Sequence, residues 1–265
     1  MSQPAATPGA VFALPLARST AHPCAYLPGR LASNEYCVAA TLDSGLYQAL
    51  MDQGFRRSGG VVYRPACAGC AECVPIRVPA AVFAPSRSQR RVLRRNADLR
   101  VEIALPRPGD DKWRLYQAYL AHQHGAEAAG DRGEFESFLY RSPLETLEMC
   151  YWLGPDLVAV GLVDVCPKSL SSVYFYFDPA HARRSLGTFG ALCEIDECRR
   201  RGMPFWYVGY YVRGCDRMNY KAQFRPHELL DEQKRWRRSA ESGNPSAALR
   251  VFPNDFRAFD SLNPK

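Results

Sequence analysis

The stretch Ser171-Ser-Val-Tyr-Phe-Tyr-Phe-Asp-Pro179, together with Arg183-Arg-Ser-Leu-Gly-Thr-Phe-Gly190 just after it, decides the fold. The first segment is a nearly continuous run of aromatic residues that ends at a proline, which favours a buried β-strand. The second opens an apolar periodic segment that predicts a helix over 185–200, ended by Gly202. A strand followed by a crossover helix points to a sheet with parallel neighbours.

Further strand patterns flank this unit. Thr146–Leu153 and Leu157–Cys166 precede it, separated by a Gly-Pro-Asp turn, and the aromatic segment Pro204–Val212 follows the helix. Three strands in succession, then a helix and a fourth strand, predict a mixed α/β (α+β) sheet in the order of GNAT-type acyltransferases. Basic residues at 86–95 predict a turn or short helix, and 110–124 a longer helix.

Proline and glycine divide the chain into expected domains. The composition, 47% hydrophobic and 23% charged, is that of a globular protein and excludes a wholly disordered or collagen-like chain. Pro106-Arg-Pro-Gly109 is the clearest break, so we predict a Cys- and Arg-rich N-terminal domain at 11–105 and a GNAT-like transferase domain at 106–232. Residues 1–10 are expected to be disordered, and 233–265 to form a loose, basic, polar tail.

Nothing in the sequence suggests export or a membrane. No apolar run reaches the roughly 18 residues that span a bilayer, and the N-terminus lacks the pattern of a secretory signal. A soluble cytoplasmic protein is therefore expected.

The positive charge is concentrated in one block. The chain of 265 residues has a formal net charge of +7. Residues 54–100 hold ten arginines and only two acidic residues, Glu72 and Asp98. This block alone therefore accounts for the excess of positive over negative charge in the chain. Arginine binds phosphate in bidentate fashion and stacks on bases. The block predicts a nucleic-acid contact, and a solvated basic face is the alternative.

The start of the predicted helix over 185–200 is similar to a phosphate-binding loop. GNAT enzymes that use acetyl-CoA hold its pyrophosphate on an Arg/Gln-x-x-Gly-x-Gly/Ala loop, where helix N–H groups and small residues let phosphate approach. Arg184-x-x-Gly187 fits that pattern, but Phe189 replaces a small residue. We predict an anion-binding helix start that does not take CoA in the usual way, with a plain cap by Ser185 as the alternative.

Three of the ten cysteines form Cys67-x2-Cys70-x2-Cys73. In a reducing compartment, such a cluster favours a metal site over disulfides. Because a metal site needs a further ligand that is missing locally, Cys24, Cys37 or His22 would have to complete it. A thiol-lined turn is the alternative.

Several motifs in a fixed order resemble the family of aminoacyl-tRNA–protein transferases, the arginyl- and leucyltransferases. They are Cys24-Ala-Tyr-Leu-Pro-Gly-Arg30, Gly54-Phe-Arg-Arg-Ser-Gly59, Tyr63-Arg-Pro-Ala-Cys67, Ser86-Arg-Ser-Gln-Arg-Arg91, Ser171–Pro179, Ser185-Leu-Gly187, Gly209-Tyr-Tyr211, Cys215-Asp-Arg-Met-Asn-Tyr-Lys221 and Phe224-Arg-Pro226. The resemblance covers most of the chain and is strongest to the short bacterial branch, whose members transfer leucine.

The resemblance implies a reaction. Leucine would move from leucyl-tRNA to the N-terminal α-amine of proteins that begin with Asp or Glu, which marks them for degradation by an N-degron pathway. The donor is an activated ester and an α-amine has a pKa of about 8, so positioning and oxyanion stabilisation lower most of the barrier. No catalytic triad and no cofactor is then required. Arginyl-tRNA is the alternative donor, with Asp178 or Glu194 as the carboxylate of its pocket.

The expected site residues come from the matched motifs. Tyr174, Tyr176 and Tyr211 are expected to line the aminoacyl and amine pocket as catalytic residues. Arg184 and Ser185 would hold the tRNA 3′ end at the helix start. The other candidate contacts, to tRNA phosphates or to the acidic acceptor side chain, are Arg56, Arg57, Arg87, Arg90, Arg91, Lys221 and Arg225.

Some relatives hold an iron–sulfur cluster with an N-terminal cysteine pair and a pair of adjacent cysteines. This sequence departs from that pattern, because Ala25 and Tyr26 follow Cys24, and Cys70 is separated from Cys73. The candidate ligands for an iron–sulfur cluster or zinc are Cys24, Cys67, Cys70 and Cys73.

Two functions from other classes compete with this interpretation. A CoA-dependent acetyltransferase would share the fold, but Phe189 argues against it. A non-enzymatic RNA-binding module built on the cysteine cluster would bind tRNA whether or not it was charged, and would leave the second half of the chain unexplained.

Overall fold

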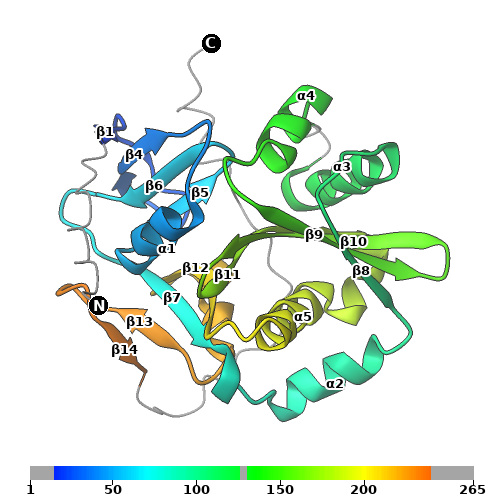
Figure 1. Cartoon of the computed structure of the whole chain (residues 1–265). Helices are drawn as coiled ribbons and strands as arrows, with labels where there is room; N and C mark the ends of the chain where they lie inside the picture. Colours follow the sequence, from blue (N-terminus) through cyan, green and yellow to red (C-terminus); the bar gives the residue numbers. More distant parts are fainter. Residues whose placement is uncertain (1–14, 126–129, 240–265) are drawn as a thin grey trace, which may run out of the picture.

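The computed structural model describes residues 15–125 and 130–239, and most of its strands form one large sheet (Figure 1). This sheet has eight strands in the order β14-β13-β7-β12-β11-β10-β9-β8. In chain order they are β7 (Cys73–Pro79), β8 (Arg100–Ala104), β9 (Thr146–Leu153), β10 (Asp156–Cys166), β11 (Ser169–Phe177), β12 (Phe205–Val212), β13 (Glu228–Leu230) and β14 (Trp236–Arg238). β11 and β12 run parallel, while the other neighbouring pairs are antiparallel.

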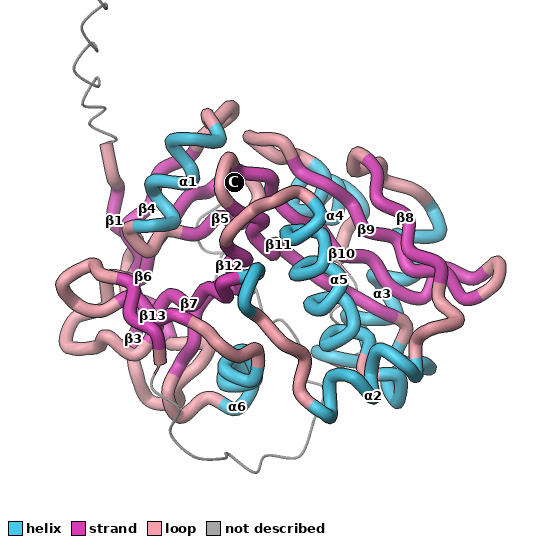
Figure 2. Tube along the Cα trace, turned by 60° about the horizontal axis from the view of Figure 1, so that its bottom comes forward, coloured by secondary structure: helices cyan, strands magenta, loops and turns pink. Residues whose placement is uncertain are grey.

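Helices cover both faces of the large sheet. The α-helices are α1 (Ser44–Asp52), α2 (Arg87–Arg95), α3 (Asp110–His124), α4 (Arg132–Phe135), α5 (Leu186–Arg200) and α6 (Asp216–Asn219). Short 3-10 turns lie at Ala80–Val82, Pro179–Arg184 and Tyr220–Gln223, and a π-helical turn at Glu136–Tyr140. α3 packs on β10 and β11 from one face, whereas α5 packs on β11 from the other and carries α2 on its outer side (Figures 1 and 2).

The aromatic residues of β11 divide between these two layers. Tyr174 and Tyr176 meet the ring of Tyr116 on α3, while Phe175 faces α5. A Cβ atom at Gly190 would lie 2.2 Å from the Phe175 ring, so glycine allows α5 to approach the sheet this closely. The alternation of side chains along a strand explains the division.

A smaller sheet from the N-terminal third packs beside the large one. Its strands, in the order β1-β4-β6-β5, are β1 (Ala17–Arg18), β4 (Asn34–Val38), β6 (Val61–Pro65) and β5 (Arg56–Ser58), and a separate two-stranded sheet joins β2 (His22–Pro23) to β3 (Leu31–Ala32). A buried cluster of Tyr47, Met51, Phe55, Val62, Cys166 and Tyr207 connects α1 and the small sheet to β10 and β12. The two sheets therefore share part of their core.

The predicted mixed α/β sheet of GNAT order is confirmed, since β9, β10, β11, α5 and β12 follow one another as expected. The predicted break at 106–109 falls between β8 and α3. However, β7 and β8 precede that break and still belong to the large sheet. Trp236–Arg238 pairs with β13 instead of starting a loose tail, because the Trp236 ring packs against Tyr207 and Arg77.

The disordered start expected at 1–10 and the tail beyond residue 239 lie outside the described residues. In the part of the chain that is described, no helix combines the length and the apolar character needed to cross a membrane.

Candidate active site

A cleft opens where the two parallel strands of the large sheet separate. β11 and β12 pair only along Ser169–Ser171 and Phe205–Tyr207. The pairing of β12 with β7 shifts register between Tyr207 and Gly209, and Gly209 has a φ of 101°. Because such a bulge bends the strand, β12 turns away from β11 toward its C-terminal end and leaves a cavity of about 50 Å³. Its walls are Tyr26, Arg56, Arg57, Tyr63, Ser172, Val173, Val208, Gly209, Tyr210, Met218, Tyr220 and Lys221.

Two basic side chains enter this cleft from opposite sides. The guanidinium of Arg56 donates a hydrogen bond to the carbonyl oxygen of Ser172 on β11. The Nζ atom of Lys221 donates to the carbonyl oxygen of Tyr210 on β12, at 3.0 Å, and lies 3.5 Å from Sδ of Met218. Each of the separating strands therefore offers a carbonyl group to a cation. Both side chains are buried, with Arg56 7% and Lys221 6% exposed.

The amine of Lys221 is electrostatically unusual. Burial lowers its pKa to about 7, and the positive charge of Arg56 acts in the same direction, while Cys73 and Cys215 act against it. Lysine is rarely buried without an acidic partner, yet among the described residues no carboxylate forms an ion pair with Lys221. Near neutral pH the amine is divided between its charged and neutral forms.

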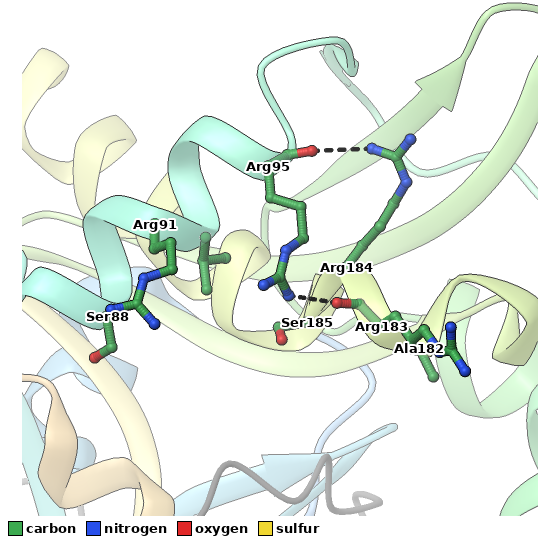
Figure 3. A pocket seen from close by; sticks show the side chains of 8 residues that line it. Ser88, Arg91, Arg95, Ala182, Arg183, Arg184 and Ser185 are labelled. Carbon is green, nitrogen blue, oxygen red and sulfur yellow. Dashed lines mark hydrogen bonds between the residues drawn. The ribbon is translucent and has the colours of Figure 1, made fainter.

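A larger, basic groove lies between α2 and the start of α5 (Figure 3). It has a volume of about 700 Å³ and is lined by Ser88, Arg91, Val92, Arg95, Ala182, Arg183, Arg184 and Ser185. The guanidinium of Arg95 donates to the carbonyl oxygen of Arg183, and the guanidinium of Arg184 donates to the carbonyl oxygen of Arg95 at 3.1 Å. These two hydrogen bonds connect the two walls of the groove. The free N–H groups at the start of α5 add positive potential to that of the arginines.

Arg184 has a second, acidic partner at the edge of this groove. Its guanidinium forms two hydrogen bonds with the carboxylate of Asp98, at 2.8 and 2.9 Å. These bonds hold the pKa of Asp98 below its usual value. Arg91 and Arg183, in contrast, form no ion pair within the described residues. These two guanidinium groups are therefore available for an incoming anion.

A capping box stabilises the first turn of helix α2. Ser86 accepts from the backbone N–H of Gln89 at 3.3 Å, and the Gln89 side chain accepts from the backbone N–H of Ser86 at 2.8 Å, which is a complete capping box. Val92 is buried on the inner face, while Arg87 and Arg91 are exposed. The helical alternative predicted for this basic segment is confirmed.

We predict that Ser86→Ala destabilises the protein by about 1 kcal/mol, because the capping hydrogen bond to α2 is lost. Ser86→Asp should restore most of that stability, because aspartate caps helices as well as serine does. Denaturant unfolding of the three proteins measures both effects. Equal stability of wild type and Ser86→Ala would contradict the role of the cap.

Arg57 has a structural role that its sequence context did not reveal. Its Nε atom donates to Asp164 Oδ2 at 2.6 Å, a second bond reaches Oδ1, and Nη1 donates to the carbonyl oxygen of Gly59 at 3.0 Å. The two charged side chains are 1% and 0% exposed. The predicted contact of Arg57 with tRNA or acceptor is therefore corrected, since its guanidinium is already occupied between β5 and β10.

The expected catalytic tyrosines do not line the cleft. Tyr174 and Tyr176 are buried beneath α3, and the Tyr176 hydroxyl lies 3.2 Å from that of Tyr140. Burial raises the pKa of Tyr176 well above its usual range. Tyr211 is half-buried and packs against the main core. The prediction that these three tyrosines line the cleft is therefore corrected, because other aromatic residues form its walls.

The rings that do line the cleft are Tyr26, Tyr63, Tyr210 and Tyr220. All four lie in motifs that signalled the family, so motif membership was the available signal. Tyr210 replaces its neighbour Tyr211 at the cleft because the bulge before Gly209 changes the alternation of β12.

The remaining predicted positions lie in different places. Arg87, Arg90 and Arg91 are exposed on α2, and only Arg91 among them lines the groove. Arg184 and Ser185 lie together in its wall. Arg225 is exposed and lines neither hollow.

Contrary to the expectation from the sequence, Phe189 does not block the groove against CoA. Its ring is buried in the core, 5.8 Å from the Tyr151 ring, and does not enter the groove.

The structure gives no support to the predicted metal site. Within the described residues, no group of three or more His, Cys, Asp or Glu is arranged so that it could hold a metal ion. The ten cysteines are free thiols. In the expected ligand set, Cys24 accepts from the backbone N–H of Leu27 at 3.4 Å, and Cys70 accepts from Arg30 at 3.2 Å. The other three thiols of this set lie near enough to Cys73 to help raise its pKa, which fits the thiol-lined turn that the sequence left as the alternative.

Two family models and several known proteins match most of the chain. Residues 22–91 match the family model described as the N terminus of arginine-tRNA-protein transferase, and residues 111–231 match the model of its C terminus. An aspartate/glutamate leucyltransferase from Stenotrophomonas maltophilia (strain R551-3) is 45% identical over 226 residues, covering 81% of this chain and 89% of the relative. Its counterpart from Pseudomonas putida (strain GB-1) is 42% identical over 225 residues, covering 81% and 92%.

Among solved structures, similarity is weaker. The C-terminal domain (DUF2156) of a candidate lysylphosphatidylglycerol synthetase from Agrobacterium fabrum matches with a TM-score of 0.45 and 15% identity, covering 69% of this chain and 63% of that one. The two family models and the high identity to the curated relatives decide the assignment. The chain belongs to the arginine-tRNA–protein transferase family and is an aminoacyltransferase.

Proposed function

We propose that this protein transfers leucine from leucyl-tRNA to the N-terminal α-amine of proteins that begin with Asp or Glu, and so marks them for N-degron degradation in the cytoplasm. The observation that carries the proposal is the identity of 42–45%, over four fifths of the chain, to relatives named aspartate/glutamate leucyltransferase. The groove and the cleft would supply separate places for the two substrates of such a reaction.

The basic groove suits the acceptor end of the tRNA. The 3-10 turn that forms its wall follows directly after β11, whereas the cleft begins at Ser172 in the same strand. Five residues separate Ser172 from Phe177, which is about 16 Å of extended chain. We propose that a 3′ end whose phosphates lie on Arg91, Arg183 and the start of α5 extends along β11, so that its aminoacyl ester reaches the cleft.

An uncharged donor side chain fits the cleft better than an arginyl group. The lining of the cleft, which lies wholly within the described residues, contains no Asp or Glu. Glu194 is buried, accepts from Nε1 of Trp206 at 2.6 Å, and has its pKa raised to about 7 by burial. Asp178 caps the following turn through the N–H of Ala180 at 2.9 Å. Neither carboxylate belongs to the lining of the cleft, where an arginyl side chain would need a negative charge.

The acidic side chain of the acceptor requires a cation, and Arg56 supplies one in the wall of the cleft. An arginine stays charged over the whole physiological range. Its present partner is the neutral carbonyl oxygen of Ser172, so a carboxylate that reaches Arg56 is the stronger partner.

Single-turnover transfer of labelled leucine from leucyl-tRNA to synthetic peptides tests the proposal. Peptides that begin with Asp or Glu should become labelled, and matched peptides that begin with Asn or Gln should react far more slowly, because they lack the negative charge. Uncharged tRNA with free leucine is the control for tRNA-dependent transfer. Absence of label on all four peptides would overturn the proposed function.

A further inference from the structure

Lys221 occupies a position that lysine seldom takes. It lies in the 3-10 turn Tyr220–Gln223 and lines the cleft that opens where β11 and β12 separate. Gly209, at the bulge of β12, makes room for it, since a Cβ there would lie 3.3 Å from Nζ. The separating strands, Gly209 and the 3-10 turn together hold the amine of Lys221 in the wall of the cleft.

We infer that Lys221 is a catalytic proton carrier: its neutral amine takes the proton of the acceptor α-ammonium in the cleft and prepares that nitrogen for attack on the aminoacyl ester. This inference rests on the proposed function. An α-ammonium has no lone pair, and at pH 7 most N-terminal amines carry that extra proton. A nearby base therefore increases the reactive fraction at the point of reaction.

The surroundings of Lys221 fit a base better than a permanent cation. Arg56 from β5 repels a positive charge there, and burial acts in the same direction. The thiols of Cys73 and Cys215 act in favour of the charged form, but more weakly than burial. The ring of Tyr220 lies 5.9 Å from Nζ, and burial raises the pKa of both Tyr210 and Tyr220, so these phenols stay neutral. An amine in this setting accepts and releases a proton near neutral pH.

The chemical step balances without another reactant. The α-ammonium gives one proton to Nζ, and the resulting amine attacks the ester carbonyl to form a C–N bond. The ester C–O bond then breaks, and its electron pair goes to the ribose oxygen of the tRNA. That oxygen takes one proton, either from the attacking nitrogen or from the charged Lys221. The products are the new amide, the free tRNA hydroxyl and one proton released to water.

The alternative role for Lys221 is to bind the carboxylate of the acceptor. That role needs a charged side chain and predicts that arginine at this position supports activity. A proton carrier predicts the opposite, because arginine stays protonated throughout the physiological range.

The test compares wild type with Lys221→Met and Lys221→Arg in single-turnover leucine transfer to a peptide that begins with Asp. We expect both variants to be slower by about 100- to 1,000-fold at pH 7, the range typical of a lost general base. The wild-type rate should rise with pH and level off just above 7. The rate of Lys221→Met should instead keep rising through the pKa of the free α-amine, about 8.

An acceptor with an aminooxy group in place of the α-amine separates proton transfer from simple positioning. This nucleophile is already uncharged at neutral pH, so the loss in Lys221→Met should be at least about tenfold smaller with it than with the α-amine. The exposed Lys168, replaced in Lys168→Met, is the matched control and should keep the wild-type rate. Circular dichroism and thermal unfolding show whether each variant is folded.

Equal losses with both acceptors, an active Lys221→Arg variant, or an unchanged pH profile would overturn the inference. These outcomes differ from failure of the proposed function, in which the wild-type protein itself transfers no leucine.

Discussion

Arg57→Met should reduce the free energy of unfolding by about 3–5 kcal/mol, because it leaves the carboxylate of Asp164 buried without its partner. Besides Arg57, the carboxylate accepts from Thr146 Oγ1 at 2.8 Å, which satisfies it only in part. The pair also connects β5 of the small sheet to β10 of the large one. Guanidinium chloride unfolding at pH 7 measures the loss.

The matched control removes both charges at once. Arg57→Met combined with Asp164→Leu eliminates the unpaired carboxylate, so it should recover a large part of the lost stability. Arg57→Lys should lie between wild type and Arg57→Met, because lysine cannot donate two parallel hydrogen bonds to one carboxylate. A loss below about 1 kcal/mol for Arg57→Met would contradict the structural role assigned to this pair.

Replacing Arg87, Arg91 and Arg183 together with glutamine should weaken tRNA binding about 50-fold at 0.15 M salt, while the fold persists. Arg91 and Arg183 line the groove, and Arg87 lies one helical turn before Arg91 on the exposed side of α2. Each phosphate contact contributes about 0.7 to the slope of log K against log salt for single-stranded nucleic acid, so that slope should fall by about 2. Binding measured at several salt concentrations gives both values.

Arg114 on α3 provides a control of the same chemical type. It is exposed and lies on the helix that covers the opposite face of the sheet, so Arg114→Gln should leave affinity and salt slope unchanged. A triple variant whose salt slope equals that of wild type would exclude the groove as the place where tRNA phosphates bind.

The helices and central strands could be predicted because their signals are local. β9 covers the residues 146–153 that were predicted as a strand. α5 begins at Leu186, one residue after the start predicted at 185, although the Ser185 side chain forms no capping hydrogen bond. Capping residues, glycine stops and alternation act within a few positions of the chain. The order of β9, β10, β11, α5 and β12 then followed from the rule that a crossover helix joins parallel strands.

The site itself was less predictable, because it depends on contacts between distant segments. Arg56 and Arg57 are neighbours of one residue type, yet the guanidinium of Arg56 bonds to Ser172 in the cleft and that of Arg57 pairs with Asp164, 107 positions away. No local pattern distinguishes them. Similarly, Tyr210 and Tyr211 exchange their expected places because of a bulge whose position depends on the pairing with β7.

A competition between two charged tRNAs in a single reaction tests most directly whether leucine is transferred to acidic N-termini. Leucyl-tRNA and arginyl-tRNA are supplied in equal amounts with one peptide that begins with Asp, and mass spectrometry identifies the residue added to its N-terminus. We predict that leucine is added in large excess over arginine, because the cleft lining lacks a carboxylate. A product that carries mainly arginine, or a peptide left unmodified, would contradict it.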